Sequence, residues 1–289
     1  MFKNKYGELR SGWAVLMVIA LTATGYLAAG FLADDDAGPG MKIVVTLIFG
    51  CITIIGGLFL FRCLYGQTHR QLGMIFKKCA PDLLHGAVVG ALSMSLIFTL
   101  LLLTGQVRVT QIDLSKLISL TIIVEIGSLS VFAFSEELLT RGLMMTAMKT
   151  TRNKYIIFIV PAFLFSLFHF LNPGVTFVSF FNTFLAGLLL AYLFIKSGKL
   201  WLPAGFHIMW NFVQGDLFGM NVSGGEAYAV FHTQIIGANR LLTGGEYGPE
   251  GGIFVTGVLV AGFIYVHFVV KPSSVPVWTV SSDLPLVRH

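Results

Sequence analysis

The amino-acid sequence predicts an all-α protein, a polytopic bundle of about eight transmembrane helices that forms a single domain over residues 1–289. Two observations predict this fold class. Hydrophobic residues make up 55% of the chain and charged residues only 11%, whereas a soluble domain carries about 25% charged residues. The apolar residues are also gathered into long runs, and a backbone inside lipid satisfies its own hydrogen bonds as a helix. Too few charges remain to cover a water-facing surface, so a soluble domain is excluded.

The apolar runs are long enough, or nearly so, to cross a bilayer as helices. They cover residues 13–33, 42–61, 83–104, 117–139, 155–171, 174–195, 200–215 and 253–270. The first run follows basic residues, as in a signal peptide. Its length of about 21 residues exceeds the ~7–15 apolar residues of such peptides, so we expect an uncleaved span. The seventh run is short and contains polar groups, so we expect it to lie inside the bundle.

The connecting loops predict the orientation of the chain. With a cytoplasmic N-terminus, fifteen basic residues lie in the inner segments and four in the outer ones, which also hold the acidic residues 34–36. This is a strong positive-inside bias, and an even number of spans brings both termini to the cytoplasm. Topology therefore explains the net charge of +5. We expect contact with membrane lipid and no nucleic-acid partner.

Two connections have a distinctive composition. Residues 68–78 mix basic and apolar side chains, as in a segment that rests on the membrane surface, although an ordinary basic loop has the same pattern. The long outer connection 216–252 contains GGEYGPEGG at 244–252, where the glycines predict turns. No Gly-Lys-Ser/Thr sequence follows them, so a phosphate-binding loop is not favoured.

Several polar side chains fall inside the apolar runs or, for the fourth run, in its continuation, where an ionisable group is costly and therefore indicates a function. They are Glu136, Glu137 and Arg141 in SEELLTRG (135–142), His169 in FSLFHF (165–170), and His207 and Asn211 in HIMWN (207–211). Counted from the nearest cytoplasmic lysines at about 1.5 Å per helical residue, the first glutamate, the two histidines and the asparagine lie about 12–22 Å deep. They share a layer of the membrane, so we expect them to converge.

These side chains are suited to two kinds of chemistry. A glutamate beside imidazoles in a dry cavity acts as a general base on water, and a histidine and an asparagine amide donate to a developing oxyanion. Alternatively, the same glutamate and histidines hold a divalent metal. Glu137 and Arg141, spaced i,i+4, are interpreted as a structural ion pair, and Phe165 as a wall of the pocket around His169. Glu125, nearer the outer side, is assigned a structural or pathway role.

The order and spacing of these residues resemble the CPBP family of intramembrane proteases, which contains the type II CAAX prenyl endopeptidases and the bacterial Abi proteins. The family pattern is EExxxR, then FxxxH, then HxxxN or HxxxD. It reads here as Glu136-Glu137-x-x-x-Arg141, Phe165-x-x-x-His169 and His207-x-x-x-Asn211. The resemblance covers residues 117–215, which we interpret as the catalytic core.

The resemblance implies hydrolysis of peptide bonds within the bacterial plasma membrane, in membrane-associated or prenylated (CAAX-type) peptide or protein substrates. By motif position, the roles are Glu136 to activate water, His169 to help hold it, His207 and Asn211 to stabilise the oxyanion, and Glu137, Arg141 and Phe165 to support the site. The family is often described as metalloproteases, so zinc is a candidate cofactor, with Glu136, His169 and His207 as its ligands. The sequence lacks HExxH and asparagine is not a usual zinc ligand, so a metal-free glutamate mechanism fits at least as well.

Two other functions fit a polytopic bundle of this kind. One is a non-catalytic membrane scaffold or bacteriocin-immunity protein that keeps the fold without turnover. The other is an ion-coupled transporter in which the buried glutamates and histidines relay protons. The intact motifs favour the enzyme over the scaffold. The sequence has no visible internal repeat and no paired Gly/Pro-broken spans in matching halves, which disfavours the transporter.

Overall fold

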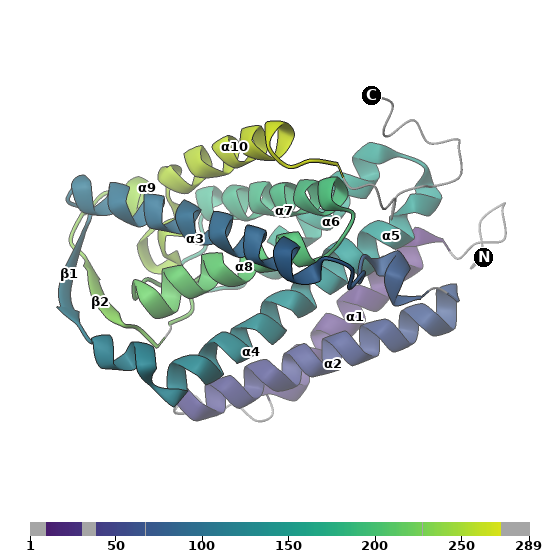
Figure 1. The fold of residues 1–289 in the computed structure, drawn as a ribbon, viewed down its shortest axis with the longest axis horizontal. Coiled ribbons are helices and arrows are strands. Elements are labelled where there is room, and N and C mark those ends of the chain that lie inside the picture. Colours follow the sequence, from purple (N-terminus) through teal and green to yellow (C-terminus); the bar gives the residue numbers. More distant parts are fainter. Residues whose placement is uncertain (1–9, 31–38, 67, 227, 273–289) are drawn as a thin grey trace.

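Each predicted apolar run contains a helix in the computed structural model, which describes residues 10–30, 39–66, 68–226 and 228–272 (Figure 1). The helices are α1 (Ser11–Gly30), α2 (Pro39–Tyr65), α3 (Cys79–Leu103), α4 (Leu120–Glu137), α6 (Lys154–Phe168), α7 (Phe177–Ser197), α8 (Trp201–Phe212) and α10 (Ile253–Phe268). Lys3, Lys5, Arg288 and residues 34–36, which contributed to the predicted orientation, lie outside the described residues, as do residues 31–33 of the first run.

Three of the described helices are long and apolar enough to cross a membrane on length and composition alone: residues Ile43–Cys63 within α2, and the whole of α3 and α7. Three shorter apolar helices lie at Ser11–Gly25, Lys154–Phe168 and Ile253–Phe268. The all-helical fold is therefore confirmed in outline, while the predicted number of about eight crossings is not.

The fourth helix continues well beyond the predicted run. It begins at Leu120, after the single turn η2 (Leu114–Ile118), because the Ser119 hydroxyl accepts a hydrogen bond from the Ile122 N–H at 3.2 Å and caps the helix. After Glu137 the backbone passes through the π-helical segment η3 (Leu138–Met144), the short helix α5 (Met145–Met148) and the turn η4 (Lys149–Thr151). The glutamates of the first motif therefore lie in the middle of a continuous helical segment, residues 120–151, rather than at its end.

A small antiparallel sheet was not predicted. Strand β1 (Val107–Ile112) follows α3 and pairs with β2 (Phe231–Ile235), with a register break between Val109 and Gln111. The sheet lies at one end of the bundle, and the two ends of the described chain lie toward the other (Figure 1). Between β2 and α10 come the single turns α9 (Arg240–Thr243), η6 (Gly245–Tyr247) and η7 (Pro249–Gly251).

Helices α3 and α8 touch backbone to backbone. A Cβ atom on Gly86 or Gly90 of α3 would collide with the carbonyl oxygens of Leu202 and Phe206, and one on Gly205 of α8 with that of Leu83. Small residues allow helices to approach this closely where lipid surrounds the bundle. The contact fixes α8, which carries His207 and Asn211, against α3 in the interior, as expected for the seventh run.

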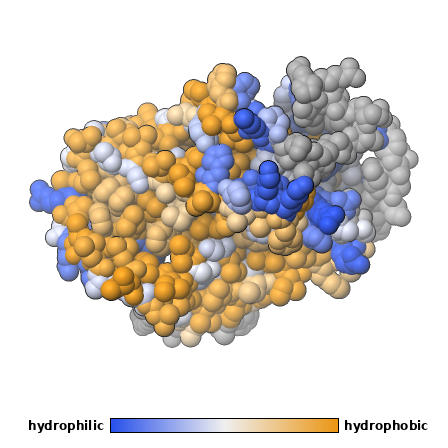
Figure 2. Space-filling model, viewed as in Figure 1, coloured by the Kyte–Doolittle hydropathy of each residue, from blue (hydrophilic) through white to orange (hydrophobic). Residues whose placement is uncertain are grey.

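Two apolar cores fill the bundle. One joins α3, α7, α8 and α10, and the other joins α1 and α2 to the segment Leu138–Met148 and α6. Large apolar side chains also cover much of the outside, and Figure 2 shows them as a nearly continuous apolar surface. Such a surface indicates burial in lipid, since soluble monomers rarely expose apolar patches larger than a few hundred Å². The protein is an integral membrane protein.

Residues 68–78 pack into the bundle more closely than a surface segment would. The turn η1 (His69–Leu72) buries Leu72, and Gly73 accepts a backbone hydrogen bond from Leu200 at 3.0 Å. Phe76 remains exposed and contacts the ring of Trp201. The mixture of basic and apolar residues therefore reflects a loop with one buried and one exposed side.

Candidate active site

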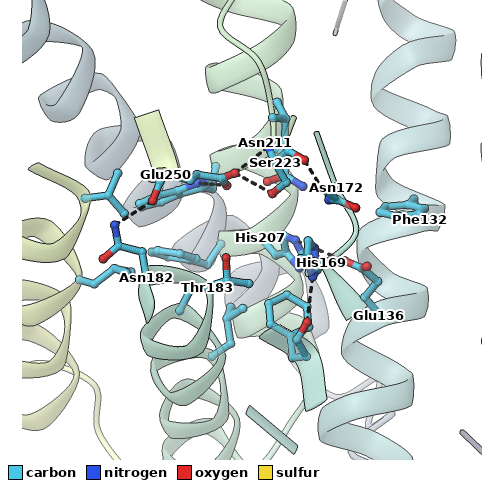
Figure 3. Close-up of a pocket in the computed structure, with 18 residues that line it drawn as sticks. Phe132, Glu136, His169, Asn172, Asn182, Thr183, His207, Asn211, Ser223 and Glu250 are labelled. Carbon is cyan, nitrogen blue, oxygen red and sulfur yellow. Dashed lines mark hydrogen bonds and ion pairs between the residues drawn. The ribbon is translucent and has the colours of Figure 1, made fainter. Parts of the chain in front are cut away.

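The motif residues from three separate segments line one cavity of about 160 Å³. Those that the sequence predicted are Glu136, Phe165, His169, His207 and Asn211. Figure 3 shows Glu136 reaching from α4 toward His207 and His169. The expected convergence of carboxylate, imidazole and amide groups is thus present in the structure.

The two glutamates of the first motif have different surroundings. Glu136 faces the cavity, where its Oε2 lies 3.7 Å from Nε2 of His207. This distance exceeds that of a direct hydrogen bond and is long enough for a water molecule to mediate. Glu137 lies behind the cavity wall, and its Oε1 accepts a hydrogen bond from Nδ1 of His207 at 2.9 Å. His207 is therefore held between the two carboxylates.

Arg141 completes the support behind His207. Its guanidinium is 1% exposed, and Nη1 donates to Glu137 Oε1 at 2.9 Å. Nη2 donates to the carbonyl oxygen of Gly187 on α7 at 3.0 Å, and the group lies 4.7 Å from the centre of the Phe165 ring. The predicted ion pair is present, and it also fixes the carboxylate that orients His207.

His169 has a defined tautomer in the structure. It lies one residue beyond the end of α6, as its C-cap, rather than inside the helix. Its Nδ1 lies 2.8 Å from the carbonyl oxygen of Phe165. A carbonyl oxygen only accepts, so Nδ1 carries a proton, and in the neutral ring Nε2 keeps its lone pair. The Phe165 ring packs 4.8 Å from His169 and 6.1 Å from His207, measured between ring centres, and so contacts both imidazoles.

Two of the three helices that carry motif residues, α4 and α8, change to π-helix beside them. The segment η3 begins directly after Glu137, and η5 (Val213–Leu217) begins two residues after Asn211. A π-turn widens the helix locally and is frequent at functional sites. The backbone is thus distorted on both sides of the cavity, and this distortion was not predicted from the sequence.

Five polar residues of the cavity were missed at the level of sequence: Asn172, Asn182, Thr183, Ser223 and Glu250. The carboxylate of Glu250 faces the cavity from the side opposite Glu136 (Figure 3). Asn182 and Thr183 lie inside the apolar run 174–195, and polar residues in such a run could have indicated a site. The others come from loops, and nothing in the sequence showed that residues 244–252 fold back to this depth.

The outer glycine-rich connection supplies part of the cavity wall. Glu250 accepts hydrogen bonds from Trp210 Nε1 at 3.2 Å and from the Ser223 backbone N–H at 2.7 Å and hydroxyl at 2.6 Å. The Tyr247 hydroxyl lies 3.3 Å from that of Thr183. Burial raises the pKa of Tyr247 to about 12. That phenol therefore remains protonated at neutral pH.

Glu125 lies in a second cavity, of about 510 Å³, together with Asp216 and Glu226. The two cavities share Phe132, Asn211 and Val222 in their walls. Glu125 is therefore a neighbour of the motif residues along α4 and does not line their cavity, in agreement with a structural or pathway role.

The geometry does not assemble the candidate zinc ligands. Among the described residues, no three histidine, cysteine, aspartate or glutamate side chains are arranged to hold a metal ion. One nitrogen of His207 binds Glu137 and one nitrogen of His169 binds Phe165, and each ring keeps the second nitrogen that a metal would need. The spacing of the groups, and not a lack of donor atoms, therefore argues against the metal site. A reaction in this cavity can instead be carried by the protein's own side chains.

Residues 118–213 match the family model of the type II CAAX prenyl endopeptidase Rce1-like proteins. This segment is similar to the Rce1-like family. All three motifs lie within it, so the resemblance to the CPBP family is confirmed. Neither a curated protein nor a solved structure matches the chain. The Rce1-like segment contains α4, α6, α7 and α8, the helices that surround the cavity.

Proposed function

We propose that the protein is an intramembrane endopeptidase that hydrolyses peptide bonds in membrane-associated or prenylated substrates, with Glu136 activating the water. The single observation that carries this proposal is that Glu136, His169, His207 and Asn211 line one cavity within the Rce1-like segment. The cavity is walled by apolar helices, where low polarity strengthens the interactions of a carboxylate with a proton or a hydrogen-bond donor.

In the first step, Glu136 accepts a proton from water while the water oxygen bonds to the carbonyl carbon of the substrate. His169 orients that water, because its Nε2 lone pair is free to accept the second hydrogen bond. The carbonyl oxygen becomes an oxyanion, and the Asn211 amide and the Nε2–H of a doubly protonated His207 donate to it. Glu137 and Arg141 act as positioning residues, because they hold the His207 ring.

In the second step, Glu136 gives its proton to the amide nitrogen of the substrate. The carbon–nitrogen bond breaks, and the products are a carboxylic acid and an amine. One carboxylate thus serves as general base and then as general acid, which a glutamate beside a single water-binding imidazole can do without a metal.

Cleavage of a fluorogenic prenylated peptide by the purified protein in detergent tests this proposal. We expect Glu136→Gln and His169→Ala each to lower kcat/KM by about 10²–10⁴-fold. Glu226→Gln is a matched control, because Glu226 is an exposed carboxylate outside the motif cavity. Cleavage that survives both active-site changes contradicts the assignment. The same peptide without its prenyl group shows whether the lipid is required.

A chelator added to this assay tests the role of zinc. The mechanism above predicts an unchanged rate in EDTA. A rate that falls and returns when zinc is added would instead assign Glu136, His169 and His207 as metal ligands.

One observation favours transport as the second candidate function. The motif cavity and the second cavity meet at Phe132, Asn211 and Val222, so ionisable groups continue from Glu136 toward the outer connections. Proton flux into liposomes that is lost in Glu136→Gln, without any peptide cleavage by the wild type, would support it. Absence of both flux and cleavage would instead leave the scaffold or immunity function.

We further propose that all eight helices cross a bacterial plasma membrane and that both termini face the cytoplasm. The distribution of basic residues in the sequence supports this orientation. The apolar faces of the short helices support their burial in lipid together with α2, α3 and α7.

A further inference from the structure

A third cavity, of about 530 Å³, lies away from the motif residues, where the start of α3, the end of α7 and the end of α10 come together. Its charged and titratable lining residues are Lys77, Lys78, Asp82, His85, Lys199 and Lys271. Figure 2 shows hydrophilic side chains gathered in this part of the molecule, beside the apolar surface of the helices. The cavity therefore combines a concentrated positive charge with the edge of the lipid-facing surface.

One of these lysines is used to build the cavity wall. Lys199 is 6% exposed, and its Nζ donates to Asp82 Oδ2 at 2.5 Å and to the carbonyl oxygen of Lys77 at 2.7 Å. These bonds join the loop before α8 to the loop before α3. They also neutralise the single carboxylate among the lining residues. No other carboxylate lines the cavity to offset the charge of the remaining lysines.

Lys77, Lys78 and Lys271 supply that charge. All three are exposed, and none forms an ion pair with another residue of the described part of the chain. Lys78 precedes α3 in the left-handed conformation, with φ of 58°, and no side chain caps the first N–H groups of that helix. The positive end of the 25-residue helix α3 therefore adds to the field of the lysines.

Apolar side chains continue from the cavity along the two helices. His85 Nε2 and the Tyr265 hydroxyl, 2.6 Å apart, connect α3 to α10. Val88 and Leu92 lie one and two turns beyond His85 on α3, and Ile264 and Phe268 lie one and three residues from Tyr265 on α10; all four side chains are exposed. A ligand for this place thus needs an anionic group and a long apolar group, one beside the other.

We propose that this cavity binds the headgroup of an anionic phospholipid. The phosphate lies among Lys77, Lys78 and Lys271, and the acyl chains lie against α3 and α10. Basic cavities between membrane helices recognise anionic headgroups, and each lysine near the surface contributes about 1 kcal/mol. The site is independent of peptide hydrolysis.

Native mass spectrometry of the full chain in detergent tests the proposal. The probes are phosphatidylglycerol, phosphatidylcholine with the same acyl chains, and glycerol 3-phosphate, which has no acyl chain. The variant Lys77→Gln/Lys78→Gln/Lys271→Gln removes the cavity charge. The matched control Arg62→Gln/Arg70→Gln/Lys154→Gln removes three exposed basic residues that do not line the cavity.

We expect the wild type and the control to prefer phosphatidylglycerol to phosphatidylcholine, and the cavity variant to lose this preference. About fivefold in affinity should be lost for each lysine replaced. Equal binding of the two lipids by the wild type overturns the proposal, whether or not the variants fold. It is also overturned if the control loses the preference as fully as the cavity variant. Displacement of the lipid by an equal concentration of glycerol 3-phosphate would assign the cavity to a free phosphate compound.

Discussion

At the scale of single residues, the site depends on a chain of contacts behind the cavity wall. Arg141 binds Glu137, Glu137 binds Nδ1 of His207, and His207 faces Glu136. Arg141 and Glu137 are 1% and 0% exposed, so their charges have only each other and a few polar groups for partners. A buried pair of this kind contributes little net stability when intact but is costly to break, because the remaining charge loses its partner.

Replacing Arg141 tests this dependence. We expect Arg141→Ala to lower the free energy of unfolding by about 3–5 kcal/mol, because Glu137 is left buried without its cation. Thermal unfolding in detergent measures the effect. Arg70→Ala is the control, since Arg70 is exposed. An unfolding temperature of Arg141→Ala equal to that of the control would show that the buried pair is not needed.

Asn211 offers a second test at this scale. If its amide donates to the oxyanion, Asn211→Ala lowers kcat by about 10²–10³-fold and leaves KM nearly unchanged, because the contact exists only in the transition state. Steady-state cleavage kinetics separate the two constants. Asn239→Ala serves as control, since that side chain caps α9 at the exposed end of the molecule. A rise in KM with constant kcat would argue for substrate binding instead.

At the scale of elements, α8 is the helix that positions the site. It carries His207 and Asn211, lines the cavity with Trp210, and lies against the backbone of α3. The close approach needs glycine on both helices. The glycines at this contact therefore determine how closely α8 lies against α3. They thereby also determine the distance from His207 to Glu136.

A methyl group at this contact should displace the helix. Gly205→Ala places a Cβ against the Leu83 carbonyl oxygen, so α3 and α8 have to separate. We expect lower thermal stability and reduced cleavage together, although alanine favours helix over glycine by about 0.8–1.0 kcal/mol. Gly257→Ala in α10, where no atom lies within 4 Å of the added Cβ, should keep full activity. Equal behaviour of the two variants would show that the backbone contact does not position α8.

At the scale of the whole molecule, the bundle has two unlike ends. The sheet β1–β2 and the glycine-rich connection lie at one end, and the basic loops around Lys154 and the lysine cavity at the other. The proposed orientation puts the first end outside and the second in the cytoplasm.

Labelling from one side of the membrane tests this orientation. The background protein has Cys51, Cys63 and Cys79 replaced by serine and is expressed in cells. In this background, His232→Cys and Lys154→Cys each introduce one exposed thiol. An impermeant maleimide added outside should label the first variant and leave the second unlabelled until the membrane is opened. Labelling of both from outside, or of Lys154→Cys alone, contradicts the proposed topology.

The sequence was sufficient to predict the helices and the motif residues, and insufficient for the contributions of the loops. Apolar runs predict helices because the backbone must bond to itself in lipid, and the spacing of Glu136, His169 and His207 identified the cavity residues. Glu250 and Ser223 escaped prediction because their positions depend on how residues 244–252 pack against α7 and α8. The sheet and the π-helical segments were missed for the same reason, since tertiary contacts determine them.

Asn182 of α7 connects the loop 250–252 to the middle of the bundle. From the middle of the bundle, its amide donates to the carbonyl oxygens of Glu250 and Gly252 at 2.7 and 2.9 Å, and its oxygen accepts from the Thr256 hydroxyl at 2.6 Å. Moving residues 250–252 aside would leave the Asn182 amide and the carbonyl oxygens of Glu250 and Gly252 without these partners, at about 1–3 kcal/mol for each group left buried. These hydrogen bonds therefore oppose opening of the loop 250–252. Entry past Phe132 and Val222, which the motif cavity shares with the second cavity, would leave these hydrogen bonds intact.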